Sequence, residues 1–276
     1  MKQFYLLPNI ITAFGLSCGL FVVFKVNMTE PGFETYDLLF TSALLLLLAA
    51  FADLLDGAVA RIIRAESEFG SMFDSLADAI SFGVAPSVLF LKSLALQPAT
   101  SISFFAVLGA MLYTICGVLR LVRFNVRAHA IKTDKVAMEA YKKNFTGLPI
   151  PAAAAGAISV NLFCHSHFSK GWFDLPYLPK ATLLTCLMIL LGYLMLSKWK
   201  FPSLKSLHFR VPSFPLILLT VLIAIFILFG IFYFFPVVLV VCSLGYILIG
   251  CILTLIRLIA GKKAKNLIDF EIDDKD

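Results

Sequence analysis

The chain has 276 residues, of which 60% are hydrophobic and 14% are charged, and its formal net charge is +6. Its mean hydropathy of +0.93 excludes a soluble domain and predicts an all-α polytopic membrane helix bundle. The positive charge is better explained by cytosolic loops and anionic lipid headgroups than by nucleic acid, because the sequence has no basic soluble domain.

Apolar segments long enough to cross a hydrocarbon core of about 30 Å predict eight transmembrane helices. Their approximate ranges are 8–26, 37–55, 76–96, 101–123, 148–166, 179–197, 213–234 and 236–258. We divide the chain into a core of six helices, residues 1–200, and a second region, residues 201–276, with a linker, a transmembrane hairpin and a tail. Lys and Arg gather in the loops on one side, which is therefore expected to be cytosolic and to hold both termini.

The first predicted span begins with Pro8 and Asn9, and Thr12 follows about one turn later. Proline suits the first turn of a helix, and the two polar side chains can face the inside of the bundle. A simple helix start explains the same residues. The sequence therefore leaves a functional and a purely structural interpretation open here.

The most informative segment joins the second and third spans and reads DLLDGAVARIIRAESEFGSMFDSLAD, residues 53–78. Asp53 and Asp56 are three residues apart, and Asp74 and Asp78 are four apart, so on helices each pair projects from one face. An Asp inside a spanning helix costs about 2.5–3.5 kcal/mol, and like charges repel. We therefore expect the four carboxylates to surround divalent cations. Oxygen ligands favour magnesium, manganese or calcium over zinc.

Other residues in this segment fit a ligand that contains phosphate. Arg61 carries a planar guanidinium suited to phosphate oxygens. Gly57 and Ala60 leave one helix face bare, so a ligand can approach the backbone closely. Carboxylate-held cations beside such an arginine are typical of phosphoryl transfer. Intramembrane carboxylates also line ion pathways, and a cation transporter is the alternative from a different class.

Later spans carry fewer candidates. Arg120 and Arg123 lie on one face at the end of the fourth span, as interface anchors or as an anion site beside the metals. The six cysteines are dispersed and indicate packing rather than disulfides or a zinc site. His165 and His167 are expected in a solvated loop on the opposite side. The last two spans are expected to serve packing, dimer contact or lipid accommodation.

The aspartate segment resembles the signature of the CDP-alcohol phosphatidyltransferases, D-x2-D-G-x2-A-R-x8-G-x3-D-x3-D. All eight specified positions match, at Asp53, Asp56, Gly57, Ala60, Arg61, Gly70, Asp74 and Asp78. The resemblance covers about the first 200 residues and implies a catalytic core of six helices, with the terminal hairpin outside it. Three more segments are similar to the membrane-bound phosphatidylserine synthases of this family: SFGVAP at 81–86, LRLVRFN at 119–125 and FTGLPIP at 145–151.

The resemblance implies transfer of the phosphatidyl group of CDP-diacylglycerol to the hydroxyl of L-serine, with release of CMP. The residues that it assigns to two divalent cations, Mg²⁺ or Mn²⁺, are Asp53, Asp56, Asp74 and Asp78, and Asp78 is also the expected general base. The residues expected to bind CDP-diacylglycerol are Gly57, Ala60, Arg61 and Gly70, with Asn9 and Thr12 as helpers. Arg120 or Arg123 is the expected partner of the serine carboxylate.

Two alternatives stay open at the level of the sequence. Within the family, the acceptor alcohol can instead be inositol phosphate, glycerol phosphate or a second lipid. The expected location is the cytoplasmic membrane of a prokaryote, with the active site facing the cytosol, and an internal eukaryotic membrane is the alternative. The resemblance also implies a homodimer surrounded by membrane lipids.

Overall fold

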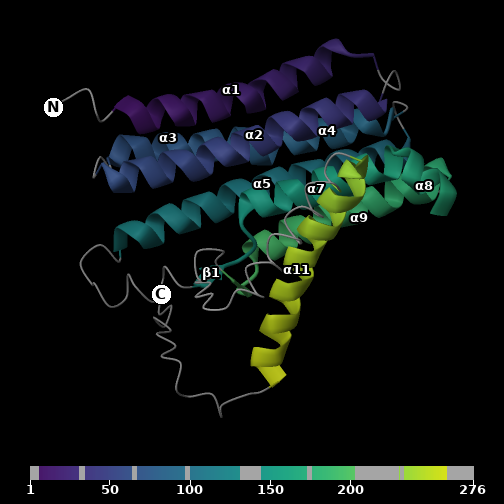
Figure 1. Ribbon diagram of the computed structural model, residues 1–276. Helices are drawn as coiled ribbons and strands as arrows, with labels where there is room; N and C mark the ends of the chain where they lie inside the picture. The colour runs from purple at the N-terminus through teal and green to yellow at the C-terminus, as the bar shows by residue number, and fades with distance from the viewer. Residues whose placement is uncertain are drawn as a thin grey trace, which may run out of the picture.

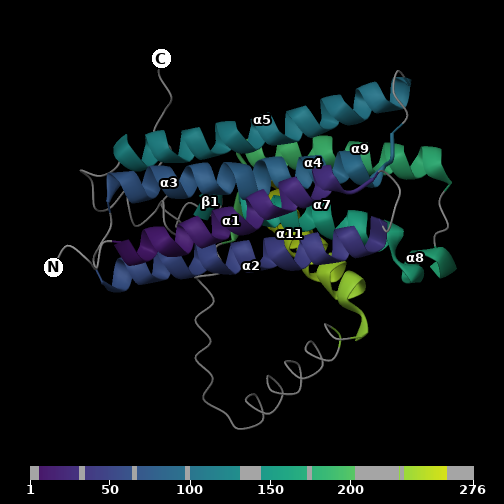
Figure 2. The same ribbon diagram turned by 90° about the horizontal axis from the view of Figure 1, so that it is seen from above.

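The computed structural model describes residues 6–30, 35–63, 67–96, 100–130, 144–172, 176–202, 230 and 233–259. Most of its helices run alongside one another as a bundle, and the last helix crosses the others obliquely (Figures 1 and 2). The elements are α1 Leu6–Met28, α2 Thr35–Ile62, α3 Glu68–Asp78, a π-helix η2 Ala79–Val84, α4 Ala85–Ser93, α5 Ser101–Ala130, β1 Asn144–Thr146, α7 Ile150–His165, α8 His167–Trp172, α9 Tyr177–Leu196, β2 Lys200–Pro202 and α11 Phe235–Ile259.

Six helical segments in these ranges are long and apolar enough to cross a membrane, and α7 is a shorter apolar helix. One of the six is the continuous segment Glu68–Ser93, which joins α3, η2 and α4. Together the seven segments coincide with seven of the eight predicted spans, which confirms a polytopic all-α membrane protein. The predicted span 213–234 and most of the predicted linker and tail lie outside the described residues.

A short antiparallel strand pair, which the sequence did not predict, joins the start of α7 to the end of α9. Phe145 of β1 lies opposite Phe201 of β2. Gly147 follows with φ +84°, a conformation that favours glycine, and its N–H donates to the Trp199 carbonyl at 2.8 Å. Strands of three residues are too short to give a recognisable alternating pattern.

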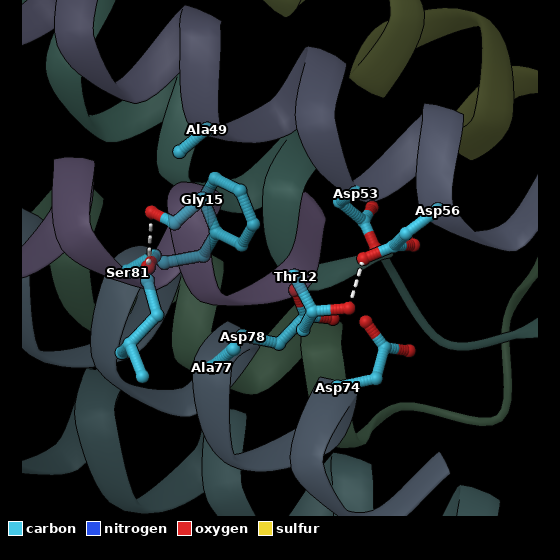
Figure 3. A pocket seen from close by; sticks show the side chains of 11 residues that line it. Thr12, Gly15, Ala49, Asp53, Asp56, Asp74, Ala77, Asp78 and Ser81 are labelled. Carbon is cyan, nitrogen blue, oxygen red and sulfur yellow. Dashed lines mark hydrogen bonds between the residues drawn. The ribbon is translucent and has the colours of Figure 1, made fainter. Parts of the chain in front are cut away.

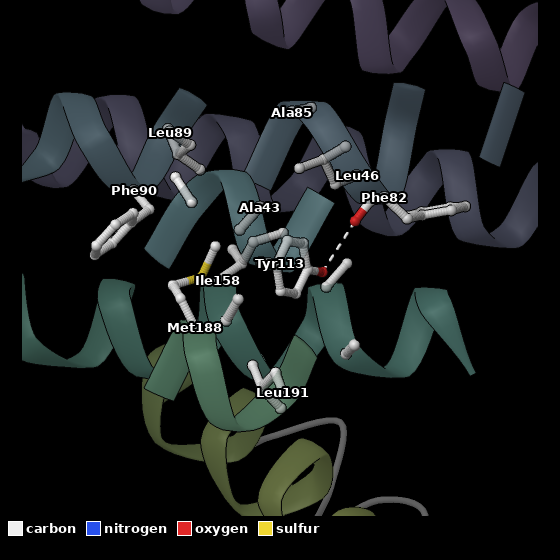
Figure 4. Close-up of a cluster of buried hydrophobic side chains, with 14 of the residues drawn as sticks. Ala43, Leu46, Phe82, Ala85, Leu89, Phe90, Tyr113, Ile158, Met188 and Leu191 are labelled. Carbon is white, nitrogen blue, oxygen red and sulfur yellow. Dashed lines mark hydrogen bonds between the residues drawn. The ribbon is translucent and has the colours of Figure 1, made fainter. Parts of the chain in front are cut away.

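Buried apolar side chains such as Phe82, Leu89 and Met188 form the core between the helices (Figure 4). Elsewhere, small residues let the helices approach each other closely. A Cβ added at Gly192 of α9 would lie 3.3 Å from the Tyr113 Cα of α5. On α1, a Cβ at Gly19 would lie 2.7 Å from the Ser81 Cα of η2, and one at Gly15 would meet Ala52 of α2 at 3.4 Å. Gly15 and Gly19 form a GxxxG pattern, which lets helix backbones approach each other, and the sequence analysis missed it in this span.

The π-helix η2 follows Asp78 directly and corresponds to the SFGVAP segment. Such wider turns occur frequently at functional sites. Polar side chains of α5 hold η2 in place: the buried Tyr113 hydroxyl donates to the Phe82 carbonyl at 2.9 Å, and Thr114 Oγ1 donates to the Gly83 carbonyl at 3.3 Å. The helix that carries Asp78 is thereby fixed against α5.

Candidate active site

Four aspartates line one cavity between the first three helices of the bundle (Figure 3). Asp53 and Asp56 come from α2, and Asp74 and Asp78 come from α3. Carboxylate oxygens of Asp53, Asp56 and Asp74 all lie within 4.8 Å of one another. The structure therefore brings together residues that are up to 21 positions apart in the sequence. The spacings of three and four residues within the two pairs predict this convergence.

The start of α3 sets the position of its two aspartates. Ser67 is the N-cap, and its Oγ accepts the Gly70 N–H at 3.0 Å. Asp74 and Asp78, one turn apart, then face the cavity. The opposite face carries the exposed apolar side chains of α3, which suit contact with lipid. These side chains include Phe69, Met72 and Leu76.

Thr12 of α1 forms a hydrogen bond with one of these carboxylates. Its Oγ1 donates to Asp56 Oδ2 at 2.5 Å, and both residues are buried, at 6% and 5% exposure. A hydrogen bond to a charged acceptor stabilises the ionised carboxylate and fixes its orientation. The structure thus places Thr12 against Asp56, and the contact with the substrate that the family resemblance implies for Thr12 stays a prediction.

Asp78 lies in the same cavity but outside the group of three close carboxylates. It interacts electrostatically with Asp53 and Asp74 and also with Arg120 of α5. Arg120 is itself buried, at 8% exposure. Asp78 therefore senses both the acidic cluster and a guanidinium, and the other three aspartates form the cluster proper.

The donor set of this cavity fits a divalent cation. The Asp74 carboxyl group is close enough to Asp53 for a hydrogen bond between them, and no Lys or Arg is among the described residues that line the cavity. Carboxylates this close repel one another unless a cation lies between them. The cavity volume is about 10 Å³, which is far too small for a nucleotide, so the nucleotide would have to bind outside it.

The residues predicted to bind the nucleotide lie near the same end of α2 and α3. A Cβ at Gly57 would meet only Arg61 Nη1, at 3.7 Å, so this face of α2 is open. Arg61 is exposed in the last turn of α2. A Cβ at Gly70 would lie 3.1 Å from Asn9 Oδ1, which places Asn9 of α1 beside α3. Ala60 is partly exposed on α2.

The two arginines predicted for the acceptor have different surroundings. Arg123 Nη1 donates to the Leu196 carbonyl at 2.9 Å and Nη2 to the Met195 carbonyl at 3.4 Å. It therefore binds the carbonyl end of α9, where a cation is favoured. Arg120, one turn earlier on α5, is the arginine near Asp78.

The sequence analysis assigned no role in the site to several residues that shape it. Gly15, Ala49, Ala77 and Ser81 line the cavity along with the acids (Figure 3). Asn125 Nδ2 of α5 donates to Ser75 Oγ of α3 at 2.9 Å and so ties the aspartate helix to α5. The GxxxG pattern in α1 was the available signal for the glycine and serine contacts.

The fold and the site define a polytopic helical membrane protein with a carboxylate site suited to divalent cations beside an open, arginine-bearing helix end. The family model described as CDP-alcohol phosphatidyltransferase matches residues 5–242. The chain belongs to this family.

Three bacterial relatives carry the name CDP-diacylglycerol–serine O-phosphatidyltransferase. The Helicobacter pylori (strain ATCC 700392 / 26695) protein is 31% identical over 224 residues, which cover 79% of this chain and 81% of the relative. The Bacillus subtilis (strain 168) protein is 32% identical over 200 residues, covering 72% and 92%. The Mycobacterium leprae (strain TN) protein is 33% identical over 221 residues, covering 80% and 65%.

Proposed function

We propose that this CDP-alcohol phosphatidyltransferase transfers the phosphatidyl group of CDP-diacylglycerol to the hydroxyl of L-serine and releases CMP. Membership of the family supports the reaction class. The names of the three relatives support serine as the acceptor. The observation that carries the proposal is the convergence of Asp53, Asp56 and Asp74 beside the open face of α2.

We assign two divalent cations, Mg²⁺ or Mn²⁺, to Asp53, Asp56, Asp74 and Asp78. When bound, such cations neutralise phosphate charge and make an acceptor hydroxyl more acidic. The hydrogen bond from Thr12 orients the Asp56 carboxylate for this purpose. The three close carboxylates are assigned as the principal ligands. Asp78, which lies outside this group of three, contributes one further ligand oxygen.

Asp78 also serves as the general base of the proposed reaction. It accepts the proton of the serine hydroxyl, whose oxygen forms a bond to the phosphorus that carries diacylglycerol. The bond between this phosphorus and the CMP oxygen breaks, and CMP leaves with the electron pair. Arg61 binds phosphate oxygens at the mouth of the cavity. Gly57 and Ala60 leave the helix face bare for the nucleotide, and Asn9 and Gly70 border it.

Arg120 is the better candidate for the serine carboxylate. Its guanidinium lies near Asp78, whereas the Arg123 guanidinium is held by the carbonyl end of α9. An arginine can bind a carboxylate through two parallel hydrogen bonds. A serine held in this way would present its hydroxyl toward Asp78, because Arg120 interacts electrostatically with Asp78.

The proposed location is a bacterial cytoplasmic membrane with the site on the cytosolic side. Arg61, Arg120 and Arg123 lie at the end of the bundle that carries the acids, and positive residues favour the cytosol. The acyl chains of the substrate stay in the bilayer while its nucleotide is in water, so the reacting phosphate lies at headgroup depth. A homodimer stays a prediction from the family resemblance.

The test is acceptor specificity of the purified protein in lipid vesicles. CDP-diacylglycerol is offered with labelled L-serine, inositol phosphate or glycerol phosphate, each with Mg²⁺ or Mn²⁺. Labelled phosphatidylserine and an equal amount of CMP are expected with serine. A product formed only with another alcohol would overturn the serine assignment, and loss of all products after chelation is expected for the metal assignment.

A further inference from the structure

The helical segment that carries Asp78 changes its hydrogen-bond register immediately after that residue. The Ala79 N–H donates to the Ser75 carbonyl, four residues back, as in an α-helix. The Ala85 N–H donates instead to the Ile80 carbonyl, five residues back. One extra residue is therefore accommodated between these two points. Because each residue of an α-helix turns it by about 100°, the extra residue changes the direction in which Asp78 points relative to α4.

Pro86, the residue after the π-helix cap, explains this change of register. Proline has no backbone N–H, and its ring clashes with the carbonyl four residues earlier, which here belongs to Phe82. A wider turn gives that carbonyl room. The Phe82 carbonyl then lacks the backbone donor that an α-helix would provide at position 86. Since Phe82 is only 2% exposed, its carbonyl needs a donor from elsewhere in the bundle.

Tyr113 of α5 supplies this donor. Its hydroxyl donates to the Phe82 carbonyl at 2.9 Å, and the side chain is fully buried (Figure 4). The next carbonyl, that of Gly83, accepts hydrogen bonds from Ser87 Oγ at 3.1 Å and from Thr114 Oγ1 at 3.3 Å. Two successive residues of α5 thus bond to two successive carbonyls of the π-helix.

The same turn forms part of the wall of the aspartate cavity. Asp78 precedes the turn, Ser81 and Phe82 lie within it, and all three line the cavity together with Asp74. An uninterrupted α-helix through this segment would rotate both acids of α3 away from those of α2. The bond from Tyr113 to Phe82 therefore acts on the part of the main chain that sets the direction of Asp78.

We propose that Tyr113 is a positioning residue for Asp78: its hydroxyl replaces the N–H that Pro86 lacks, keeps the turn after Asp78 in the π register and so directs the Asp78 carboxylate into the cavity. The inference rests on the proposed function, because it takes Asp78 as the general base. Tyr113 acts through the main chain of η2 and not through a contact of its own with a substrate.

The experiment measures CMP release and thermal unfolding of the purified full-length protein. Tyr113→Phe keeps the ring and removes only the hydroxyl. We expect kcat to fall about 10- to 100-fold, because a small misplacement of a catalytic group has effects of this size, while the KM for serine is unchanged. Tyr193→Phe, which removes the same group from an exposed position on α9, is the matched control and is expected to match the wild type.

A double variant separates positioning from stability. Pro86→Ala restores a backbone N–H at position 86, so in Tyr113→Phe/Pro86→Ala the Phe82 carbonyl can accept an ordinary helical hydrogen bond. We expect the unfolding temperature to return toward that of the wild type while kcat stays low, because a straightened helix turns Asp78 out of the cavity. A tyrosine that only stabilises the fold would give recovery of both.

A wild-type kcat in Tyr113→Phe or in the double variant would overturn the inference and leave the proposed function intact. The double variant decides the question even where Tyr113→Phe is too unstable to purify. An unchanged kcat in Asp78→Asn would overturn the proposed base and the inference together. Since the assay detects CMP, use of an acceptor other than serine would overturn the serine assignment and leave the test of Tyr113 valid.

Discussion

The two halves of the bundle differ in their acidic side chains. The half formed by α1, α2, α3, η2 and α4 carries all four site aspartates, whereas the described residues of α5, α7, α9 and α11 contain no Asp or Glu at all. The second half contributes support instead: Tyr113 and Asn125 of α5 hold η2 and α3 in place. Buried acids are costly in an apolar bundle, so they are gathered where cations can bind, and the other half aligns them.

Of the substitutions that test this division of roles, Asp78→Asn is expected to have the largest effect on activity. Removing the proposed base from the acidic half should lower kcat about 10²- to 10⁴-fold while the protein stays folded, as measured by CMP release and thermal unfolding. Asp37→Asn, which changes an acid in the first turn of α2, is the control and should keep its activity. Equal activity of the two variants would contradict a base at Asp78.

Asp74→Asn tests whether the acidic half depends on cations for stability. In the wild type, Mn²⁺ at 100 times its Kd should stabilise the folded state by about 2.7 kcal/mol, seen as a higher unfolding temperature. Asp74→Asn should reduce this gain, because one of the three close carboxylates is neutral. It should also be at least as stable as the wild type without metal, since repulsion is relieved. A wild type that Mn²⁺ does not stabilise would argue against the site.

Gly19→Ala tests the alignment of α1 with the π-helix. The added Cβ would lie 2.7 Å from Ser81 Cα, so the helices must separate, with an expected loss of about 1–3 kcal/mol in the free energy of unfolding. Activity should fall with it, because Ser81 lines the aspartate cavity. Gly245→Ala on α11 is the matched control, since nothing lies within 4 Å of its added Cβ. Chemical denaturation of both variants in detergent micelles gives the comparison.

Thr12→Val should have the smallest effect of the four. The substitution keeps the shape of the side chain but removes the hydrogen bond to Asp56, so activity should fall about tenfold, equivalent to roughly 1.4 kcal/mol. More metal should be needed for half-maximal rate, since the carboxylate is less well oriented. Thr182→Val, at an exposed Thr that bonds within its own segment, should behave like the wild type. An unchanged metal requirement in Thr12→Val would exclude this role of Thr12.

The amino-acid pattern alone predicts the membrane class, the seven spans that fall within the described residues and the convergence of the aspartates, because hydrophobic length and helical spacing are local properties. It could not distinguish Arg120 from Arg123, since both lie on one face of α5 and only the carbonyl end of α9 engages one of them. It missed the strand pair, the π-helix and the hydrogen bond from Thr12 to Asp56. These depend on which helices meet, and residues 44 positions apart become neighbours only when the tertiary structure packs α1 against α2.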